Sequence, residues 1–192
     1  MKKPILLDFP SEFQTERLLL RLPLPGDGKV VHQAITASKN ELKPWLPFAQ
    51  KEQTPDETEI SVRDAHIAFQ QRTDLRLHIF EKATGDFIGC TGLHRINWNV
   101  PKFEIGYWVD SRKSGNYFMT EAVKGVTEFA FRELHANRVE IRCDSENDRS
   151  RAIPERLQFT LEGILHHDDI APDESGLRDT CIYAKTKEKR IK

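Results

Sequence analysis

The stretch from Lys102 to Phe131 constrains the fold more than any other part of the sequence. It opens with a run typical of a β-strand, KFEIGYWVD, continues through the polar turn SRKSGNY, and ends in a helical pattern. Ala122, Val126 and Phe129 recur there at three- and four-residue spacing, which predicts an amphipathic helix with one face in the core. A strand that turns directly into such a helix exposes the first helical N–H groups to whatever lies over the turn.

The chemistry of this turn is suited to an anion. The first N–H groups of a helix have no partner inside the helix, and the helix dipole adds about half a positive charge there. Gly115 lets backbone approach a ligand closely. Arg112 and Lys113 add positive charge, and Ser114 and Thr120 add hydroxyls. Helix N-termini of this kind commonly bind phosphate, although the same residues also suit an ordinary solvated loop.

The rest of the chain predicts a mixed α/β domain around a central sheet. Residues 75–109 alternate in a way that indicates an antiparallel meander of three strands. The proline-rich run KPWLPFAQKEQTP predicts an irregular loop with apolar anchors, and Asp56 is the expected N-cap of the helix that follows. The predicted strands are 17–22, 74–80, 87–96, 102–110, 137–144, 159–170 and 176–186, and the predicted helical segments lie within 26–40, 56–72, 111–131 and 147–159.

Composition gives no support to several classes of function. The chain has 192 residues, enough for one domain, and its 29 basic and 30 acidic residues give a net charge of −1. This balance gives no argument for binding to nucleic acid or to a membrane surface. No apolar run approaches the roughly 20 residues of a membrane span, and no signal peptide is recognisable, so we expect a cytoplasmic protein.

Metal and disulfide chemistry are not expected either. Cys90, Cys143 and Cys181 are odd in number and lie far apart, which indicates reduced thiols. His166 and His167 are neighbours on a predicted strand, where successive side chains point to opposite faces. They are therefore poorly placed to chelate a metal ion.

The run EIGYWVDSRKSGNYFMTEAVKGVTEFAF resembles the acyl-CoA-binding core of the GNAT superfamily of N-acetyltransferases, and more narrowly its Rim-type branch. The family motif is Arg or Gln, two residues, Gly, one residue, then Gly or Ala; Arg112 and Gly115 match it. The resemblance extends from TERLLLR to NDRSRAIPERLQFTLEG, about residues 14–186 of a single domain spanning 1–192. Two departures are Tyr117, where Gly or Ala is expected, and Gln158, where the family usually has Gly.

The resemblance implies a GNAT-like fold and acetyl-CoA as co-substrate. It implies a mostly antiparallel twisted sheet of about seven strands with about four helices, splayed between the fourth and fifth strands to admit the pantetheine arm. No metal is implied. The residues expected to bind the cofactor are Trp108, Val109, Arg112, Lys113, Ser114, Gly115, Asn116, Tyr117, Phe118, Met119, Thr120 and Asn147.

Tyr117 is the main question that the resemblance raises. Its backbone N–H can still bind a phosphate, and because the family tolerates Ala there, we do not expect a positive φ to be required. The remaining difficulty is steric. The ring has to point away from the pyrophosphate or lie along the pantetheine arm, so we expect weakened or altered CoA binding more readily than none.

Direct attack of an amine on the thioester needs a base and an acid. By the family's Asn-x-x-Ser pattern, Ser150 is the expected acid near the CoA sulfur; the alternative is that Asn147 and Ser150 only cap a short helix. Glu104 is the expected base, directly or through a water, and the alternative is a solvated strand carboxylate. Glu140 and His94 are weaker candidates for the base.

The Rim-type branch acetylates the N-termini of ribosomal proteins, which makes a protein α-amine the expected acceptor. Such an amine has a pKa near 8, against about 10.4 for lysine, and costs roughly 3 kcal/mol less to deprotonate at neutral pH. The expected acceptor-pocket residues are Trp45, Leu46, Phe48 and His94.

The alternatives are a small amine such as a polyamine, aminoglycoside or amino-acid derivative, a non-catalytic acyl-CoA-binding module, or a generic nucleotide-phosphate binder. A homodimer is possible, because dimers are common in this branch of the family.

Overall fold

The computed structural model describes residues 3–187 of the chain. Its strands are β1 Glu12–Gln14, β2 Leu18–Arg21, β3 Leu75–Glu81, β4 Phe87–Asn97, β5 Lys102–Val109, β6 Arg138–Asp144, β7 Thr160–Ile170 and β8 Leu177–Thr186. Its α-helices are α1 Gly28–Ala37, α2 Lys39–Leu42, α3 Pro55–Gln71, α4 Phe118–Arg132 and α5 Asp148–Arg156, and short 3₁₀ turns occupy Pro4–Leu6, Pro47–Ala49 and Ser111–Lys113.

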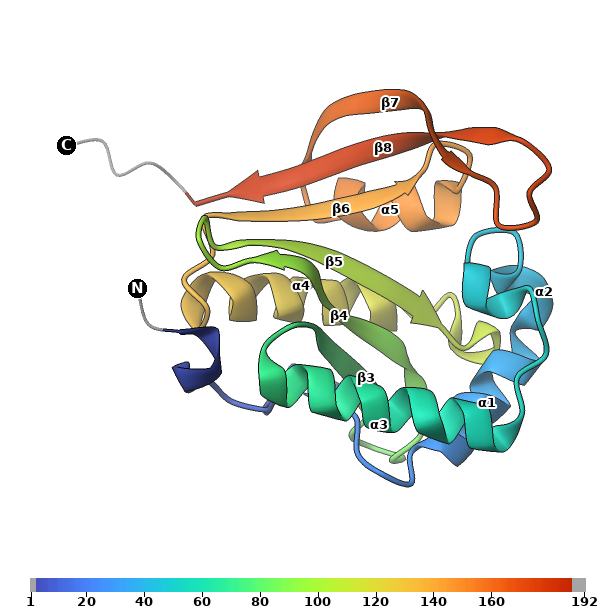
Figure 1. Ribbon diagram of the computed structural model, residues 1–192, viewed down its shortest axis with the longest axis horizontal. Helices are drawn as coiled ribbons and strands as arrows, with labels where there is room; N and C mark the ends of the chain where they lie inside the picture. The colour runs from blue at the N-terminus through green and yellow to red at the C-terminus, as the bar shows by residue number, and fades with distance from the viewer. Residues whose placement is uncertain (1–2, 188–192) are drawn as a thin grey trace.

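The strands form one sheet in the order β1-β2-β3-β4-β5-β6-β8-β7. Every neighbouring pair is antiparallel except β5 and β6, which run parallel. This pair is joined only from Lys102 to Glu104 on β5 and from Arg138 to Glu140 on β6. Beyond those residues the two strands diverge toward the ends that lead into α4 and α5 (Figure 1). The predicted splay between the fourth and fifth strands is confirmed at this point.

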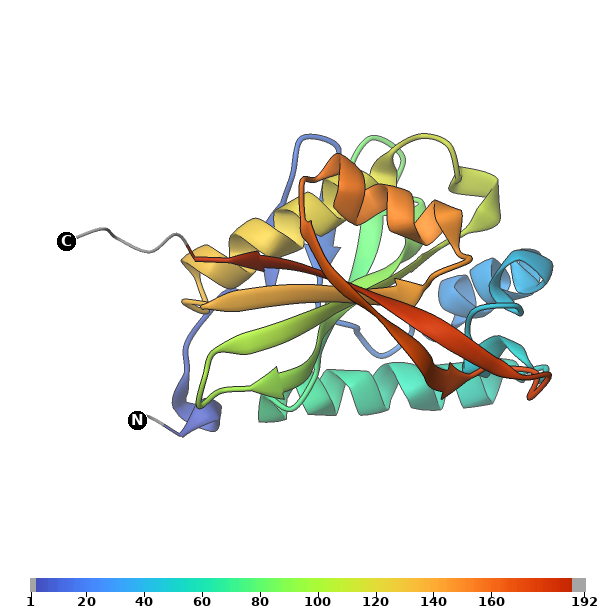
Figure 2. The same ribbon diagram turned by 90° about the horizontal axis from the view of Figure 1, so that it is seen from above.

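Helices cover both faces of the sheet. In Figure 2, α4 and α5 lie on one face and α3 lies on the other. The apolar stripe of α4, including Ala122 and Val126, is fully buried in a core shared with Phe103 and Ile105 of β5. On the opposite face, Val31 of α1 and Val62 of α3 pack over Cys90 of β4 in a smaller cluster. The sheet therefore separates a face bearing α4 and α5 from a face bearing α1 and α3.

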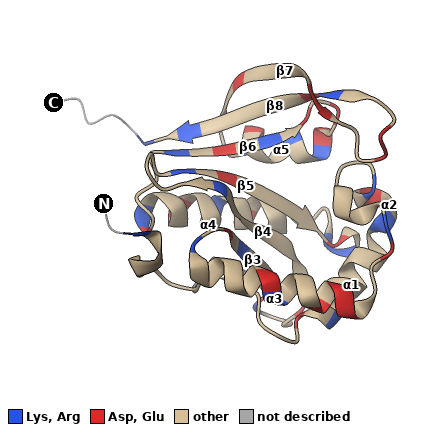
Figure 3. Cartoon of the chain, viewed as in Figure 1, with Lys and Arg blue, Asp and Glu red and all other residues tan. Residues whose placement is uncertain are grey.

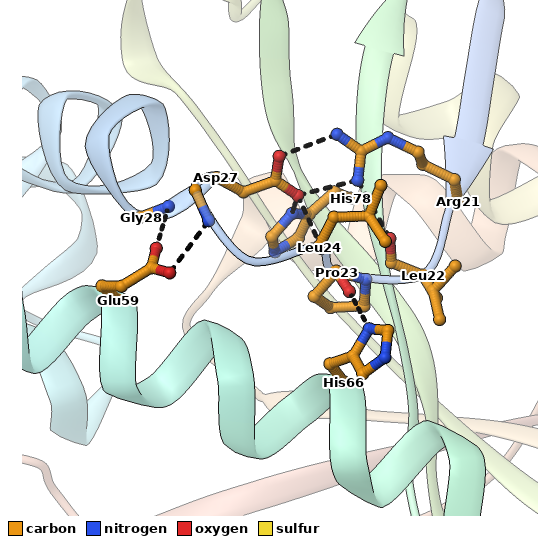
Figure 4. Close-up of polar contacts among 10 residues, drawn as sticks. Arg21, Leu22, Pro23, Leu24, Asp27, Gly28, Glu59, His66 and His78 are labelled. Atoms are coloured by element: carbon orange, nitrogen blue, oxygen red, sulfur yellow. Dashed lines mark hydrogen bonds and ion pairs between the residues drawn. The ribbon is translucent and has the colours of Figure 1, made fainter.

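A buried polar cluster fixes the start of α1 on the sheet (Figure 4). Arg21 of β2 donates twice to Asp27, at 2.7 and 2.8 Å, and His78 Nδ1 of β3 lies 2.8 Å from the same carboxylate. Burial alone would raise the pKa of Asp27, but the contacts with Arg21 and His78 outweigh it and hold that pKa far below its usual range. Glu59 of α3 accepts the N–H groups of Gly26 and Gly28 at 2.8 and 3.0 Å, which ties α3 to the same turn.

The structure differs from the sequence-based expectation in small elements. Eight strands and five α-helices are present in residues 3–187, rather than about seven and four. The additional elements, β1 and α2, have three and four residues, too few to produce a periodic pattern. The N-cap of α3 is Thr54 and not Asp56, because the proline that follows occupies the first helical position.

Charged residues of both signs are spread over helices and strands, in keeping with the net charge of −1 (Figure 3). Among the helices of residues 3–187, none is both long and apolar enough for a bilayer. In the same range no three His, Cys, Asp or Glu side chains gather closely enough to hold a metal ion.

Candidate active site

Two carboxylates hold the turn between β5 and α4: Asp110 of the turn itself and Asp86, which precedes β4. Asp110, buried at the end of β5, accepts a hydrogen bond from the backbone N–H of Arg112 at 3.0 Å and from its guanidinium at 2.5 Å. Burial alone would raise the pKa of Asp110, but the Arg112 contacts outweigh it and lower that pKa. The Lys113 ammonium donates to Asp86 at 2.6 Å. The two predicted cationic binding residues are thus paired within the protein and hold the turn in place.

Beyond these contacts the turn leaves donors open. Within residues 3–187, the backbone N–H groups of Gly115, Asn116 and Tyr117 donate to no acceptor. Gly115 has φ +83°, and a Cβ placed on it would meet no atom within 4 Å. Helix α4 then begins without a side-chain cap. These consecutive donors, next to a positive helix end, are chemically suited to the oxygens of a phosphate or pyrophosphate.

Tyr117 has a positive φ, which was not expected from the sequence. Its φ is +60° and its ψ +12°, so the left-handed backbone is used here without glycine, and that expectation was wrong. Tyr117 is 63% exposed, and the Arg156 guanidinium of α5 lies 5.1 Å from its ring centroid. Gln158, the second departure from the family pattern, also has a positive φ, of 58°. Both departures place a bulky residue in a backbone region that favours glycine.

The remaining predicted residues of this turn differ in what they offer. The side chains of Phe118 and Met119 are buried in the core, so only their backbone groups face the turn. Ser114 is exposed. The Thr120 hydroxyl accepts a hydrogen bond from Arg156 at 3.2 Å, which connects the first turn of α4 to α5.

The gap between β5 and β6 adjoins this turn. Trp108 and Val109 pair with Cys90 and Gly89 of β4 on one side, but have no paired residue on the β6 side. Their edge of β5 is therefore open, as an extended ligand that adds to a strand requires.

Ser150 and Asn147 lie at the start of α5, across the gap. The Asn147 side chain accepts the Ser150 N–H at 3.1 Å, which is a normal N-cap. The Ser150 hydroxyl donates to the Tyr107 hydroxyl at 3.2 Å, and Tyr107 in turn donates to the Ser150 carbonyl at 2.9 Å. Burial raises the pKa of Tyr107, so it remains a neutral donor. Asn147 therefore does cap α5, as one of the two alternatives proposed. The cap uses the Ser150 backbone N–H, so the Ser150 hydroxyl remains beside Tyr107 at the gap.

Tyr107 is a site residue that the sequence did not single out. The sequence does show a tyrosine on a predicted strand. That its hydroxyl faces α5 is known only once the register of β5 is known. Half-buried Cys143 of β6 shares this neighbourhood, and burial raises the pKa of its thiol to about 12 against an opposing hydrogen bond with Ser150. Cys90 and Cys181 are buried free thiols.

Glu104 lies at the point where β5 and β6 part, on the face that bears α1 and α3. Its carboxylate is 18% exposed and stands 3.6 Å from the Arg95 guanidinium. Burial raises its pKa, which Arg95 only partly offsets. Glu140, its partner on β6, instead holds Arg138 at 2.6 Å and Lys102 at 3.1 Å. Glu104 therefore has fewer and more distant cationic partners than Glu140, and its carboxylate is freer to accept a proton.

The predicted acceptor-pocket residues are only partly brought together. Phe48 lies with its ring centroid 6.0 Å from that of Trp108, so it borders the open strand. Trp45 and Leu46 are half-buried in the preceding loop, and no ring contact links Trp45 to the site within the described residues. His94 lies directly opposite Glu104 in the β4–β5 register, and its Nδ1 is 2.6 Å from Asp74.

Comparison with known proteins identifies the domain. Residues 17–160 match the family described as the acetyltransferase (GNAT) domain. YdaF of Bacillus subtilis (strain 168), provisionally named a ribosomal N-acetyltransferase, is 31% identical over 80% of this chain and 88% of its own length. The ribosomal-protein-serine acetyltransferase of Escherichia coli (strain K12) is 25% identical over 89% of this chain and 93% of its own.

Two solved structures share the fold. RimL, a ribosomal-protein α-N-acetyltransferase in complex with coenzyme A, has a TM-score of 0.83 at 23% identity and covers 90% of this chain and 95% of its own. The microcin self-immunity acetyltransferase MccE, in complex with acetyl-CoA and AMP, has a TM-score of 0.84 at 23% identity, with coverages of 93% and 98%.

Proposed function

The chain belongs to the GNAT family of acetyl-CoA-dependent acetyltransferases, and we propose that its acceptor is the α-amino group of a protein N-terminus, with a ribosomal protein as the substrate class. The structural observation that supports acetyl-CoA-dependent chemistry is the uncapped start of α4, whose free N–H groups lie beside the unpaired edge of β5. The curated relatives named for ribosomal-protein acetylation support the acceptor class.

The residues present fit the cofactor. In this proposal the backbone N–H groups from Gly115 to Tyr117 and the first turn of α4 bind the pyrophosphate, and the open edge at Trp108 and Val109 binds the pantetheine arm. Arg112 and Lys113 contribute through the shape of the turn, since both are paired with carboxylates. When bound, acetyl-CoA supplies an activated acetyl group as a thioester.

The proposed base and acid lie on opposite sides of the gap between β5 and β6. Glu104, on the acceptor side, attracts the ammonium and accepts its proton directly or through a water. The amine lone pair then forms the C–N bond to the acetyl carbon, and the C–S bond breaks with its electron pair passing to sulfur. Ser150, held by Tyr107, donates a proton to the resulting thiolate and is reprotonated from solvent.

An α-amine suits a site of this kind. Deprotonating it at neutral pH costs roughly 3 kcal/mol less than deprotonating a lysine side chain. Glu104, with a pKa raised by burial, is a moderate base and not a strong one. The proposal therefore favours a peptide N-terminus over a lysine or a polyamine.

The test pairs binding with turnover. Calorimetric titration with acetyl-CoA, with ATP as control, is expected to give micromolar binding for acetyl-CoA alone. Thiol release is then measured with six-residue peptides that begin with serine or alanine, with the same peptides blocked at the α-amine, and with spermidine. Turnover confined to free peptide N-termini supports the proposal. Turnover of spermidine alone contradicts the acceptor class, and binding without turnover of any amine contradicts the enzymatic role.

A further inference from the structure

The pair formed by Asp74 and His94 lies on the acceptor side of the sheet. The sequence suggested His94 as an acceptor-pocket residue and a weaker candidate for the base, and the mechanism above gives the pair no step. Asp74 precedes β3, and its carboxylate is 2.6 Å from His94 Nδ1 on β4. Both side chains are about one-third exposed, at 34% and 30%. An imidazole that donates Nδ1–H to a carboxylate carries its lone pair on Nε2. This nitrogen is therefore the free end of the pair.

The free end lies over β5, beside Glu104. His94 and Glu104 are directly opposite each other in the antiparallel register, so their side chains emerge on the same face about 5 Å apart at Cβ. Gly106, two residues further along, leaves room for the ring, since a Cβ there would stand 2.9 Å from His94 Cδ2 and 3.1 Å from Nε2. The ring thus occupies the space above Gly106, and any larger residue at 106 displaces it.

Charged groups of both signs surround the His94 ring. The carboxylates of Asp74 and Glu104 flank it, and Arg95 stands 3.6 Å from Glu104. Asp64 of α3 and Arg76 of β3 line a groove of about 330 Å³ together with Asp74. Arg95 and Arg142 are the cations that act on Glu104, and Asp74 and Glu104 are the carboxylates closest to the ring.

Resting on the function proposed above, we propose that His94, oriented by Asp74, is the terminal proton acceptor for the amine. The ammonium gives a proton to Glu104, and Glu104 passes it, directly or through a water, to His94 Nε2. The ring becomes imidazolium while His94 keeps its Nδ1–H, hydrogen-bonded to Asp74. The amine keeps its lone pair for the acetyl carbon. The imidazolium then loses its proton to solvent, so no oxidant or further reactant is required.

The physical reason is basicity. A carboxylate is ordinarily about two pKa units less basic than an imidazole, and an α-amine is more basic than either. Moving the proton on to an imidazole lowers the uphill cost of freeing the amine. Glu104 would keep its role of attracting the ammonium, and Asp74 is a positioning residue that fixes the tautomer.

The experiment compares His94→Gln and Asp74→Asn with the wild-type protein, using the peptide that the wild type acetylates best. We expect kcat to fall about tenfold in H94Q and about threefold in D74N, with acetyl-CoA affinity unchanged. We also expect the acid limb of the kcat/KM profile of H94Q to move to lower pH, since a carboxylate alone then holds the proton. Imidazole added to His94→Ala, which empties the space above Gly106, should restore part of the turnover.

The chain contains a matched control pair. His166 of β7 and Asp179 of β8 are 2.7 Å apart but lie on the outer hairpin, and H166Q and D179N should stay within about twofold of wild type. A kcat and acid limb of H94Q that match wild type overturn the inference, as does a loss of turnover in H94A that imidazole does not restore. Absence of turnover by the wild-type protein would instead overturn the proposed function itself.

Discussion

Helices α3 and α4 are of similar length, yet their first turns satisfy their backbone N–H groups in different ways. Thr54 and Glu57 form a reciprocal capping box at α3: the Thr54 hydroxyl accepts the Glu57 N–H at 3.2 Å, and the Glu57 carboxylate accepts the Thr54 N–H at 2.7 Å. At α4, Tyr117 occupies the N-cap position in a left-handed conformation with no side-chain cap. Glu121, in its first turn, reaches away to Thr15 and Arg17 instead.

The comparison teaches that a helix end can serve either stability or binding. A capped end contributes about 1 kcal/mol and has fewer donors left for a ligand. An uncapped end forgoes that energy and keeps its donors for an anion. Helix α5 is intermediate, because Asn147 caps its backbone while the Ser150 hydroxyl stays at the gap.

The largest effect is expected at the start of α5, the intermediate case. Ser150→Ala keeps the backbone N–H that Asn147 caps but removes the hydroxyl, so kcat should fall about a hundredfold while acetyl-CoA affinity and stability change little. Steady-state kinetics and calorimetry measure the two quantities. Equal losses of turnover and affinity would assign Ser150 a structural role only.

Gly115→Asp tests the open end directly. A carboxylate beside the free N–H groups repels a pyrophosphate, and about 2 kcal/mol of repulsion weakens acetyl-CoA binding about thirtyfold. Gly115→Asn is the matched control, because it has the same shape and a similar tolerance of positive φ without the charge. Equal affinities of the two variants in calorimetry would exclude a phosphate at this turn.

Thr54→Ala removes the side-chain cap at the start of α3. Loss of the capping box should lower the free energy of unfolding by about 1 kcal/mol in urea denaturation. Acetyl-CoA affinity should not change, because this helix end has no role in the site. A weakened affinity would contradict the separation of roles between the two helices.

Tyr117→Gly sharpens the comparison at the open end. Relief of the left-handed backbone contributes about 1–2 kcal/mol, and the loss of the ring's contact with Arg156 offsets about 0.5–1 kcal/mol of it. We expect a net gain of about 0.5–1 kcal/mol in unfolding free energy and unchanged or tighter acetyl-CoA binding. Gln158→Gly is the control: it should gain about 1–2 kcal/mol, because no ring contact is lost there, and have no effect on binding. Clearly weaker binding in Y117G would mean that the ring contacts the ligand.

The smallest expected effect concerns pH. Burial alone would raise the pKa of Glu121, but hydrogen bonds from Thr15 and Arg17 outweigh it and lower that pKa. The folded pKa lies below the unfolded one, so this stabilisation is present above about pH 4.3 and is lost as the pH falls further. Glu121→Gln should flatten the acid dependence of unfolding more than Glu57→Gln does, because Glu57 is exposed. The reverse order in acid-dependent urea titrations would contradict this account.

Much of the fold follows from local pattern. The strand, turn and helix from Lys102 to Phe131 and the meander of 75–109 are legible in the sequence, because side-chain periodicity reports which face of an element is buried. The resemblance to the acetyltransferase family, which residues 17–160 confirm, came from the same stretch. The short β1 and α2 were missed, since neither completes a period.

The sequence by itself determined the order of the main elements and the open turn at Gly115, because both depend on residues close together along the chain. Tertiary structure alone decided that Tyr107 meets Ser150, that His94 stands between Asp74 and Glu104, and that Glu59 closes the start of α1. These contacts join residues ten or more positions apart. Their existence depends on strand register and helix placement, which the packing of the whole core sets and no local pattern contains.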